Sequence, residues 1–192
     1  MILSDFDLEN MIRAKRIVIE PFEKGIIREN GVDLRITDEI GRHNPERDGD
    51  FVVDPSDPKH VNEEYLLERN GSGNVIRPHE QVLMSTIEYI KMPDNLVGFV
   101  EQRSTWARHG LMLPPTIIDA GFEGNITLEV FNASSHGILL RPGMRFAHVI
   151  FAATLNRVSN DYKGKYLGQR GVRLPKVITN GDIDGKDDNH GT

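Results

Sequence analysis

The sequence predicts a mostly β fold in which short antiparallel strands form a sandwich, a jelly roll or a barrel. From Val75 onward, apolar runs of strand length recur, separated by turn residues such as Pro78, Gly121 and Gly124. Strands at this spacing, with little helix between them, are typical of antiparallel all-β architectures. The chain has 192 residues, of which 38% are hydrophobic, and this is enough to bury one sizeable core.

A short helix is predicted over residues 3–15. Ser4 is favoured as an N-cap because its hydroxyl accepts a backbone N–H. Leu8, Met11 and Ile12 follow at helical spacing and form one apolar stripe. The pattern indicates an amphipathic helix at the N-terminus.

Two strands are predicted next, over residues 16–20 and 31–36. In the second, apolar residues alternate with Asp33 and Arg35, which is typical of a half-buried strand. Gly31 just before it indicates a turn or a close approach of another backbone.

Residues 41–74 are polar and rich in turn residues, which predicts a long excursion from the β domain. Short strands are expected inside it, over residues 51–53 and 65–68. A short helical turn is expected within residues 103–113. The remaining strands are expected over residues 75–78, 81–90, 96–101, 125–132, 137–141 and 146–152.

The C-terminal part divides into two segments. Residues 162–176 begin with a run of cations, glycines and tyrosines, which is either a solvated extension or a lid that folds over an anion. Residues 177–192 are acidic and are expected to be disordered. We therefore expect a single β domain over residues 1–176, followed by this tail.

Composition excludes several classes of function. A formal net charge of −6 argues against a nucleic-acid binder, although a local cluster of cations can still serve a small anion. No apolar run approaches the roughly 20 residues that span a bilayer, and the N-terminus lacks the basic region of a secretory signal. The expected location is the cytoplasm, with neither membrane nor nucleic acid as partner.

The chain contains no cysteine, which excludes disulfides, thiolate nucleophiles and cysteine-ligated zinc. Its seven histidines are scattered, without an i, i+4 pair. A zinc site built from protein ligands is therefore not expected, and the sequence predicts no metal-ligating residues.

Two arginines and two hydroxyls stand close together at Arg103, Ser104, Thr105 and Arg108. Because guanidinium groups match phosphate oxygens, the group is a candidate phosphate clamp. The alternative is a solvated loop with an ion pair to Glu101 or Glu123. The spacing alone does not decide between the two.

Asp119 lies where an apolar pair runs into a glycine-rich turn. Its carboxylate either caps its own backbone, as turn aspartates do, or accepts a sugar hydroxyl or positions a water.

Glu129 lies on a predicted strand whose other face is apolar, with Phe131 beside it. A carboxylate on a partly buried face costs free energy unless it is paired or used in chemistry. The alternative is that this face is solvated.

Four motifs at compatible spacings resemble the dCTP deaminases of the trimeric dUTPase superfamily. They are R-S-T-W-A-R, I-D-A-G-F-E-G-N-I-T-L-E-V-F-N, R-P-G-M-R-F and Y-K-G-K-Y-L-G-Q-R-G. The opening M-I-L-S-D and the strand G-V-D-L-R-I resemble this family too, so the likeness extends from the first residue to about Lys176.

The resemblance implies a distorted jelly roll of the dUTPase type and a homotrimer, or a dimer of trimers, with active sites between subunits. It implies deamination of dCTP to dUTP and ammonia without zinc, with Mg²⁺ carried by the substrate triphosphate. dTTP is a candidate feedback inhibitor. The alternatives are a bifunctional enzyme that continues to dUMP and pyrophosphate, a plain dUTPase, and a nucleotide-binding regulator without catalysis.

The resemblance also implies roles for individual residues. Glu129 matches the general acid–base, and Ser104 and Arg108 match residues that hold the water, the base edge and the glutamate. The implied substrate contacts are Arg103, Ser104, Thr105, Trp106, Ala107, Arg108, Asp119, Thr127, Leu128, Glu129, Tyr162, Lys165 and Gln169. Among them, Arg103, Ser104, Thr105 and the backbone of the same turn hold the phosphates, and Asp119 holds the 3′-hydroxyl. The backbone around Thr127 and Leu128 reads the cytosine edge. The lid is formed by Tyr162, Lys165 and Gln169.

Two positions depart from the family pattern. Pro114-Pro115 stand where many members have an H-x-T-A segment beside the reacting atom, which leaves the product open. His148 stands where several relatives have glutamine, and a packed histidine is the expected role.

Overall fold

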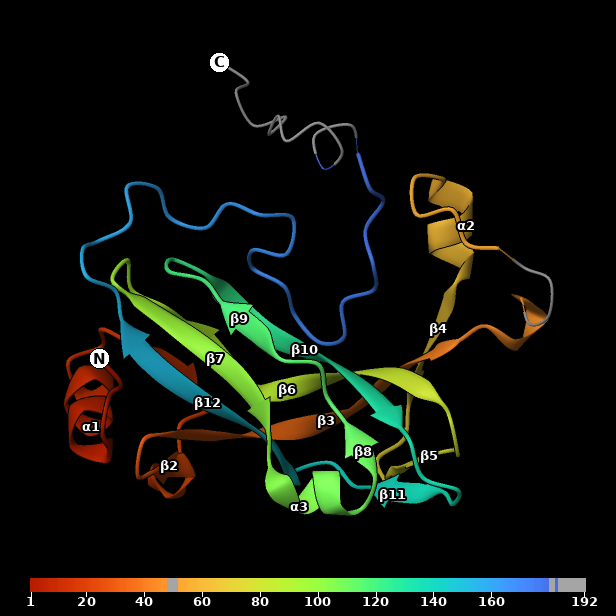
Figure 1. Ribbon diagram of the computed structural model, residues 1–192, viewed down its shortest axis with the longest axis horizontal. Coiled ribbons are helices and arrows are strands. Elements are labelled where there is room, and N and C mark those ends of the chain that lie inside the picture. The colour runs from red at the N-terminus through yellow and green to blue at the C-terminus, as the bar shows by residue number, and fades with distance from the viewer. Residues whose placement is uncertain (48–51, 180–181, 183–192) are drawn as a thin grey trace.

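One curled antiparallel sheet forms the body of the computed structural model, which describes residues 1–47, 52–179 and 182 (Figure 1). Its strand order is β8-β10-β6-β3-β12-β7-β9, with β1 paired to β6, and β2 and β4 paired to β3; β5 and β11 form a separate pair. The strands are β1 (Val18–Glu20), β2 (Ile27–Arg28), β3 (Gly31–His43), β4 (Tyr65–Arg69), β5 (Asn74–Ile76), β6 (Gln81–Lys91), β7 (Leu96–Gln102), β8 (Leu111–Met112), β9 (Thr116–Ile118), β10 (Glu123–Asn132), β11 (Ile138–Leu140) and β12 (Arg145–Ala153). The predicted mostly β class is confirmed.

The helical segments are few and short. They are α1 (Asp5–Arg13), α2 (Pro58–Glu63), α3 (Ser104–Arg108) and two 3-10 turns, η1 (Lys24–Ile26) and η2 (Pro45–Arg47). The predicted N-terminal helix is confirmed as α1: the Ser4 hydroxyl accepts the Asp7 N–H while the Asp7 carboxylate accepts the Ser4 N–H. Leu8 is fully buried beneath this helix. None of the helices in the described residues is both long and apolar enough to span a membrane.

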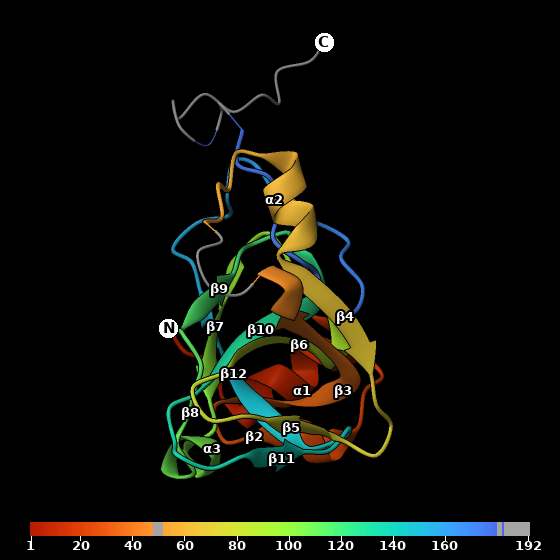
Figure 2. The same cartoon turned by 90° about the vertical axis from the view of Figure 1, so that its right-hand side faces the viewer.

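The sheet curls around on itself (Figure 2), and its strands supply most of the hydrophobic core. Alternate residues of β3, β10 and β12 point into it, and Leu34, Leu128 and Phe146 are each fully buried. The period-2 pattern of these strands therefore predicted their inner faces.

The excursion differs from its prediction in two ways. β4 confirms a strand near residues 65–68, but the strand expected over residues 51–53 is wrong: Val52 and Val53 lie outside any strand, and Phe51 lies outside the described residues. The segment holds α2 instead, started by an Asp57 N-cap and Pro58. The tail that was expected to be disordered spans residues 177–192. Of these, residues 180, 181 and 183–192 lie outside the described part of the chain.

β3 is about twice as long as predicted, and its first four residues (31–34) are buried on both faces. The second half of β3 is polar, but it forms backbone hydrogen bonds with β4 and β6. This pairing with strands distant in sequence extends β3 beyond Ile36 to His43. Asp33 was expected on a solvated face and is only 2% exposed. It is buried because β12 pairs alongside, with His148 directly opposite it.

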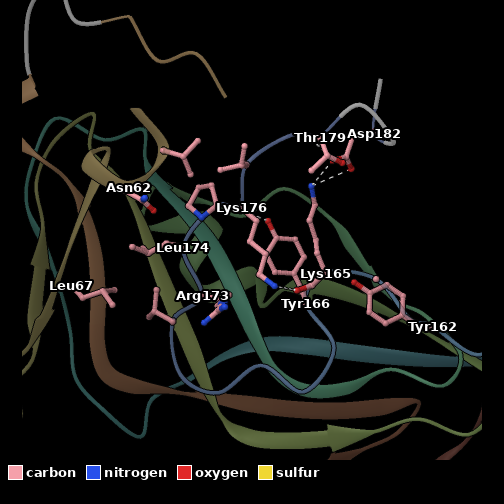
Figure 3. Close-up of a pocket in the computed structure, with 15 residues that line it drawn as sticks. Asn62, Leu67, Tyr162, Lys165, Tyr166, Arg173, Leu174, Lys176, Thr179 and Asp182 are labelled. Atoms are coloured by element: carbon pink, nitrogen blue, oxygen red, sulfur yellow. Dashed lines mark hydrogen bonds and ion pairs between the residues drawn. The ribbon is translucent and has the colours of Figure 1, made fainter. Parts of the chain in front are cut away.

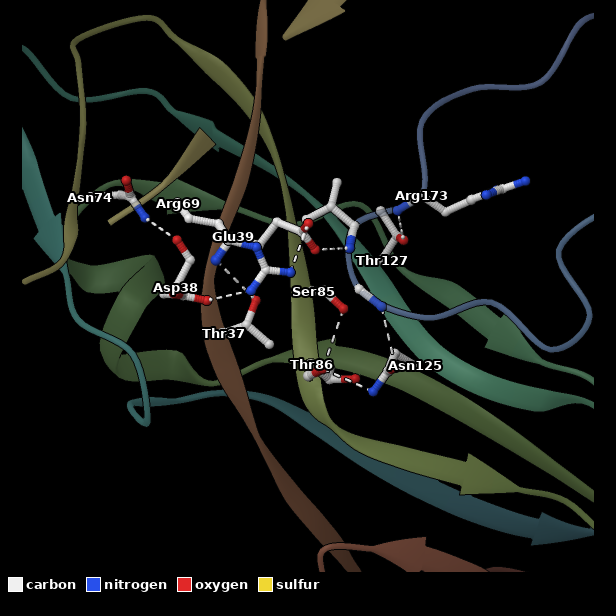
Figure 4. A network of polar contacts seen from close by, with 12 residues as sticks. Thr37, Asp38, Glu39, Arg69, Asn74, Ser85, Thr86, Asn125, Thr127 and Arg173 are labelled. Atoms are coloured by element: carbon white, nitrogen blue, oxygen red, sulfur yellow. Dashed lines mark hydrogen bonds and ion pairs between the residues drawn. The ribbon is translucent and has the colours of Figure 1, made fainter. Parts of the chain in front are cut away.

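The C-terminal arm (residues 162–176) lies along β10 and continues its hydrogen bonding. The Asn125 N–H donates to the Gln169 carbonyl at 3.0 Å, and the Gln169 side-chain amide donates back to the Asn125 carbonyl at 2.6 Å. Farther along, the Arg173 N–H donates to the Thr127 hydroxyl at 3.1 Å, and the Val172 N–H donates to Glu39 at 2.6 Å (Figure 4). The arm is therefore fastened to both β10 and β3.

Gly31 is tightly packed, as its place before a strand indicated. A Cβ added there would overlap the Val149 carbonyl oxygen and the His148 ring. We predict that Gly31→Ala lowers the free energy of unfolding by about 1–3 kcal/mol or more, because the paired strands must separate to admit the methyl group. Gly71→Ala, with no atom within 4 Å of the added group, is the matched control. Equal denaturation midpoints for the two variants would contradict the close approach.

Candidate active site

A cavity of about 330 Å³ opens where β10 passes beneath the C-terminal arm. It is lined by Tyr65, Gln81, Leu83, Thr116, Ile117, Ile118, Asp119, Phe122, Ile126, Thr127, Glu129, Tyr162, Tyr166, Gln169, Arg173 and Pro175. Five of the predicted site residues therefore meet in one place, from β10, from the turn after β9 and from the arm.

A bulge in β10 helps to set the direction of the cavity-lining side chains. The register with β6 shifts between Asn125 and Thr127, and such bulges bend a strand and re-aim its side chains. The buried Asn125 amide holds the bulge by donating to the carbonyls of Thr86 and Ile87, at 3.1 and 3.2 Å. Beyond the bulge, Leu128 and Val130 enter the core while Thr127 and Glu129 face the cavity.

Glu129 lies in a desolvated environment, as its apolar neighbours on the strand indicated. Burial raises the pKa of its carboxyl above the ordinary value. Tyr65, on the same cavity, has its pKa raised to about 12, chiefly by burial and then by the nearby charges of Glu64 and Glu129. A carboxyl whose pKa is raised holds a proton more readily than an ordinary glutamate, which favours the proton exchange that a general acid–base carries out.

Asp119 keeps its carboxylate available. The turn is closed by the Phe122 N–H donating to the Asp119 backbone carbonyl at 3.1 Å, and the side chain makes no hydrogen bond or ion pair within the described residues. The self-capping alternative is therefore wrong, and the exposed carboxylate is free to accept a hydroxyl at the cavity mouth.

The arm begins beside this turn and carries two tyrosines to the cavity. The Tyr162 N–H donates to the Ala120 carbonyl at 3.0 Å, and its ring meets Phe122 edge-on with centroids 5.5 Å apart. Burial raises the pKa of the Tyr162 hydroxyl. The arm thus lies closed against the protein, with Tyr162, Tyr166 and Gln169 facing the same space as Glu129.

Lys165, also predicted for the lid, lies in a neighbouring cavity of about 900 Å³ between the arm and α2 (Figure 3). Its ammonium group lies 3.2 and 3.3 Å from the two carboxylate oxygens of Asp182, and its carbonyl accepts from Lys176. Within this chain, Lys165 therefore does not reach the cavity of Glu129.

The predicted phosphate turn lies elsewhere. Figures 1 and 2 show α3 at the end of the molecule opposite the arm and α2. Ser104, Thr105, Ala107 and Arg108 are exposed there, and none of them lines the Glu129 cavity. The candidate site is therefore in two halves that one chain does not bring together.

Local contacts explain how this turn is held. The Trp106 indole N–H donates to the Arg145 carbonyl at 2.8 Å, and its ring stacks on Phe146. The Arg103 guanidinium lies 3.5 Å from Asp33, so the alternative in which it pairs with Glu101 or Glu123 is wrong for this residue. Its partner comes from β3, which the local sequence did not indicate.

Sequence reasoning missed several residues of the cavity. Tyr65 comes from an excursion that had no predicted role, and Tyr166 and Arg173 come from the arm. The backbone N–H of Arg173 donates to the hydroxyl of Thr127, which is two residues from Glu129. The Arg173 guanidinium has no carboxylate partner in the described part of the chain. Only the alternation of aromatic and cationic residues in the arm signalled these contacts.

No three histidine or acidic side chains lie close enough together to hold a metal ion among residues 1–47, 52–179 and 182. The donors present in these ranges thus offer no protein-built metal centre.

Comparison with known proteins gives a consistent result. A family model described as dCTP deaminase-like matches residues 2–154. The dCTP deaminase of Metallosphaera sedula is 45% identical over 177 residues, covering 92% of this chain and 98% of its own length; that of Sulfurisphaera tokodaii is 48% identical, covering 93% and 94%. The crystal structure of 2'-deoxycytidine 5'-triphosphate deaminase from Agrobacterium tumefaciens aligns with a TM-score of 0.62 and 17% identity, over 78% of this chain and 46% of that one. This last match shows a shared fold.

The desolvation of Glu129 predicts a pH-dependent stability change. Its pKa is raised in the folded state, so the folded protein binds the proton more tightly, and stability falls as pH rises through the folded pKa. Glu129→Gln should therefore unfold at a higher temperature than the parent at about pH 8, and this gain should vanish near the ordinary glutamate pKa of about 4.3.

Thermal unfolding across this range checks the prediction. The exposed Glu20→Gln is the control and should show no such trend. If Glu129→Gln is no more stable than the parent at either end of the range, burial does not destabilise the charged carboxylate. The desolvated environment described for Glu129 would then be wrong.

Proposed function

The chain belongs to the dCTP deaminase-like family, and on that premise we propose how its residues deaminate dCTP to dUTP and ammonia. The observation that carries the proposal is Glu129, a desolvated carboxyl in a cavity that also holds a free aspartate and two tyrosines of the arm. These groups suit a small polar substrate with a sugar and a base.

The reaction replaces the amino group at C4 of cytosine by a carbonyl oxygen. Glu129 takes a proton from a water molecule as the water oxygen bonds to C4, and a tetrahedral intermediate forms. The carboxyl donates this proton to the ring nitrogen N3. It then takes the proton of the new C4 hydroxyl and passes it to the amino group, so that C4–O becomes a carbonyl. The C4–N bond breaks and ammonia leaves, so that dCTP and water give dUTP and ammonia.

The cavity supplies the other contacts in this proposal. Asp119, free at the mouth, accepts the 3′-hydroxyl of the deoxyribose. The backbone at Thr127 and Leu128 faces the cytosine edge; the Leu128 side chain is fully buried and serves the core. Tyr162 and Gln169 close over the nucleotide and exclude water, which strengthens polar interactions at the reacting atoms.

The other half of the proposed site, which holds the phosphates and brings Arg108 to the base, comes from a second copy of the chain. Arg103, Ser104, Thr105 and Arg108 lie at the opposite end from the cavity, so a copy related by rotation must bring its turn to the Glu129 of its neighbour. Such a head-to-tail contact closes into a ring, for which we propose a trimer, alone or paired as a dimer of trimers. Trp106 and Ala107 complete this turn through their backbone.

We further propose that Mg²⁺ arrives on the triphosphate oxygens of the substrate. When bound, it neutralises part of the phosphate charge and keeps several of its waters. dTTP shares the deoxyribose and triphosphate with dCTP, so it competes for the same contacts and is proposed as an inhibitor.

Product analysis tests the activity. Incubation with dCTP and Mg²⁺ should release dUTP and ammonia in equal amounts, and Glu129→Gln should lower this rate by about 10²–10⁴-fold while dCTP still binds, because only proton transfer is lost. Absence of ammonia with the parent enzyme would sink the proposal. Accumulation of dUMP in place of dUTP would identify an enzyme that also cleaves the triphosphate.

Mixing inactive variants tests the shared site. Glu129→Gln and Arg108→Ala subunits, dissociated and reassembled in equal amounts, should regain up to about a quarter of parental activity, because random assembly pairs an intact cavity with an intact turn at that frequency. Glu129→Gln mixed with Asp119→Ala is the control and should regain none, since both residues belong to the same half. Recovery in both mixtures, or in neither, would contradict a site shared between subunits.

A further inference from the structure

One buried carboxylate collects four basic side chains beside the phosphate turn. Asp33 is 2% exposed, and its Oδ1 accepts from the His148 ring, whose Nδ1 lies 3.0 Å away. Its Oδ2 faces three guanidinium groups: the nearest nitrogens of Arg103, Arg145 and Arg28 lie at 3.5, 3.8 and 3.9 Å. We call these five residues the Asp33 cluster.

Distant parts of the chain build this cluster. β3 carries Asp33 and β12 carries Arg145 and His148, while Arg28 comes from β2 and Arg103 from the residue before α3. In Figures 1 and 2, β2 and α3 lie at the same end of the molecule. The cluster therefore belongs to the same surface as the phosphate turn.

The cluster carries excess positive charge. Three guanidinium groups face one carboxylate, and no other carboxylate in the described ranges lies within 4.0 Å of these three arginines. Their side chains are 43%, 34% and 37% exposed for Arg28, Arg103 and Arg145, so each still reaches solvent. A surface of this charge attracts anions within an otherwise acidic protein.

The guanidinium donors are also not used up by Asp33. Separations of 3.5–3.9 Å are longer than hydrogen bonds, and the buried Oδ2 has no hydrogen-bond partner in the described part of the chain. A purely structural ion pair in the same sheet looks different: Glu88 is fully buried and accepts from Arg35 Nε at 2.6 Å and from its backbone N–H at 2.8 Å. Asp33 thus gathers the arginines without saturating them.

The position of the cluster relative to the turn indicates which phosphate it meets. Arg108, at the C-terminal end of α3, is assigned to the base, whereas Arg103 precedes α3 and points to Asp33. The cluster therefore lies on the side of the turn away from the base, where the end of the triphosphate belongs.

We infer that Arg28 and Arg145 bind the terminal phosphate of the nucleoside triphosphate, and that Asp33 holds them beside Arg103 for this purpose. Two forked guanidinium groups match the oxygens of a terminal phosphate, which carries the most charge of the three. The inference rests on the proposed function, since it takes the turn that begins at Arg103 as the phosphate site.

Substrate truncation tests the inference directly. For Arg28→Gln and Arg145→Gln, the KM for dCTP should rise about tenfold or more, because a charge-assisted contact to phosphate is lost. The inhibition constant of dCDP should change by less than about threefold, because dCDP lacks the terminal phosphate and so never makes this contact. Arg28→Lys keeps the charge without the fork and should fall between Arg28→Gln and the parent.

Two controls separate the possible failures. Arg157→Gln removes an exposed arginine whose ion-pair partner among the described residues is Asp94 alone, and it should leave both constants unchanged. Arg103→Gln should weaken dCTP and dCDP alike; if it weakens neither, the turn is not the phosphate site and the proposed function fails together with this inference. If Arg103→Gln weakens both ligands while the Arg28 and Arg145 variants weaken neither, or weaken dCTP and dCDP equally, the terminal-phosphate assignment alone is overturned.

Thermal unfolding of each variant distinguishes binding from folding. A structural role would lower the unfolding midpoint and shift both ligands together, whereas a phosphate contact changes the ratio of the two constants in a folded protein. Should Arg145→Gln fail to fold, Arg28→Gln and Arg28→Lys still decide the assignment, because Arg28 lies on a short edge strand and is 43% exposed.

Discussion

The buried amide of Asn125 is the contact on which the candidate site depends. Its nitrogen donates to two carbonyls of β6 and so holds the bulge in β10, while its oxygen accepts from Gly171 of the C-terminal arm at 3.3 Å. Its backbone groups exchange hydrogen bonds with Gln169. One residue thus fixes both the direction in which Glu129 points and the position of the arm that covers it. Because buried amide groups are costly to leave unpaired, this arrangement is strongly specified.

Three carboxylates on the same sheet show how partners decide the use of a buried charge. Glu88 is fully paired by Arg35 and serves the fold. Asp33 is surrounded but not saturated, so its arginines remain available to an anion. Glu129 has no cation within ion-pairing distance among the described residues, and its pKa rises because burial disfavours its charged form. The same side-chain chemistry therefore gives a structural ion pair at Glu88, the proposed anion-binding surface at Asp33 and the proposed proton-transfer group at Glu129.

The proposed division of the site between two ends of the chain has a physical basis. A cavity that must open for a charged substrate and then exclude water is easier to build between rigid surfaces than inside one packed core. In the proposed site, β10 and the arm face the base and the sugar, and the turn at α3 carries the cations for the phosphates. The α3 side of the proposed site is exposed in a single chain. The side chains of Ser104, Thr105 and Arg108 make no hydrogen bond or ion pair there within the described residues.

Local sequence determined the β class, the N-terminal helix, the edges of most strands and the identity of Glu129 as an unusual carboxylate, because alternation and turn chemistry act over a few residues. It did not determine the second half of β3, the helix α2 or the missing strand near Val52, because polar strands exist only where a partner pairs with them. It also gave no sign that Tyr65 reaches Glu129, or that Asp33 joins Arg28, Arg103 and Arg145. Apart from Arg28 and Asp33, which are five residues apart, those contacts join residues tens of positions apart, so only the packing of the curled sheet could decide them.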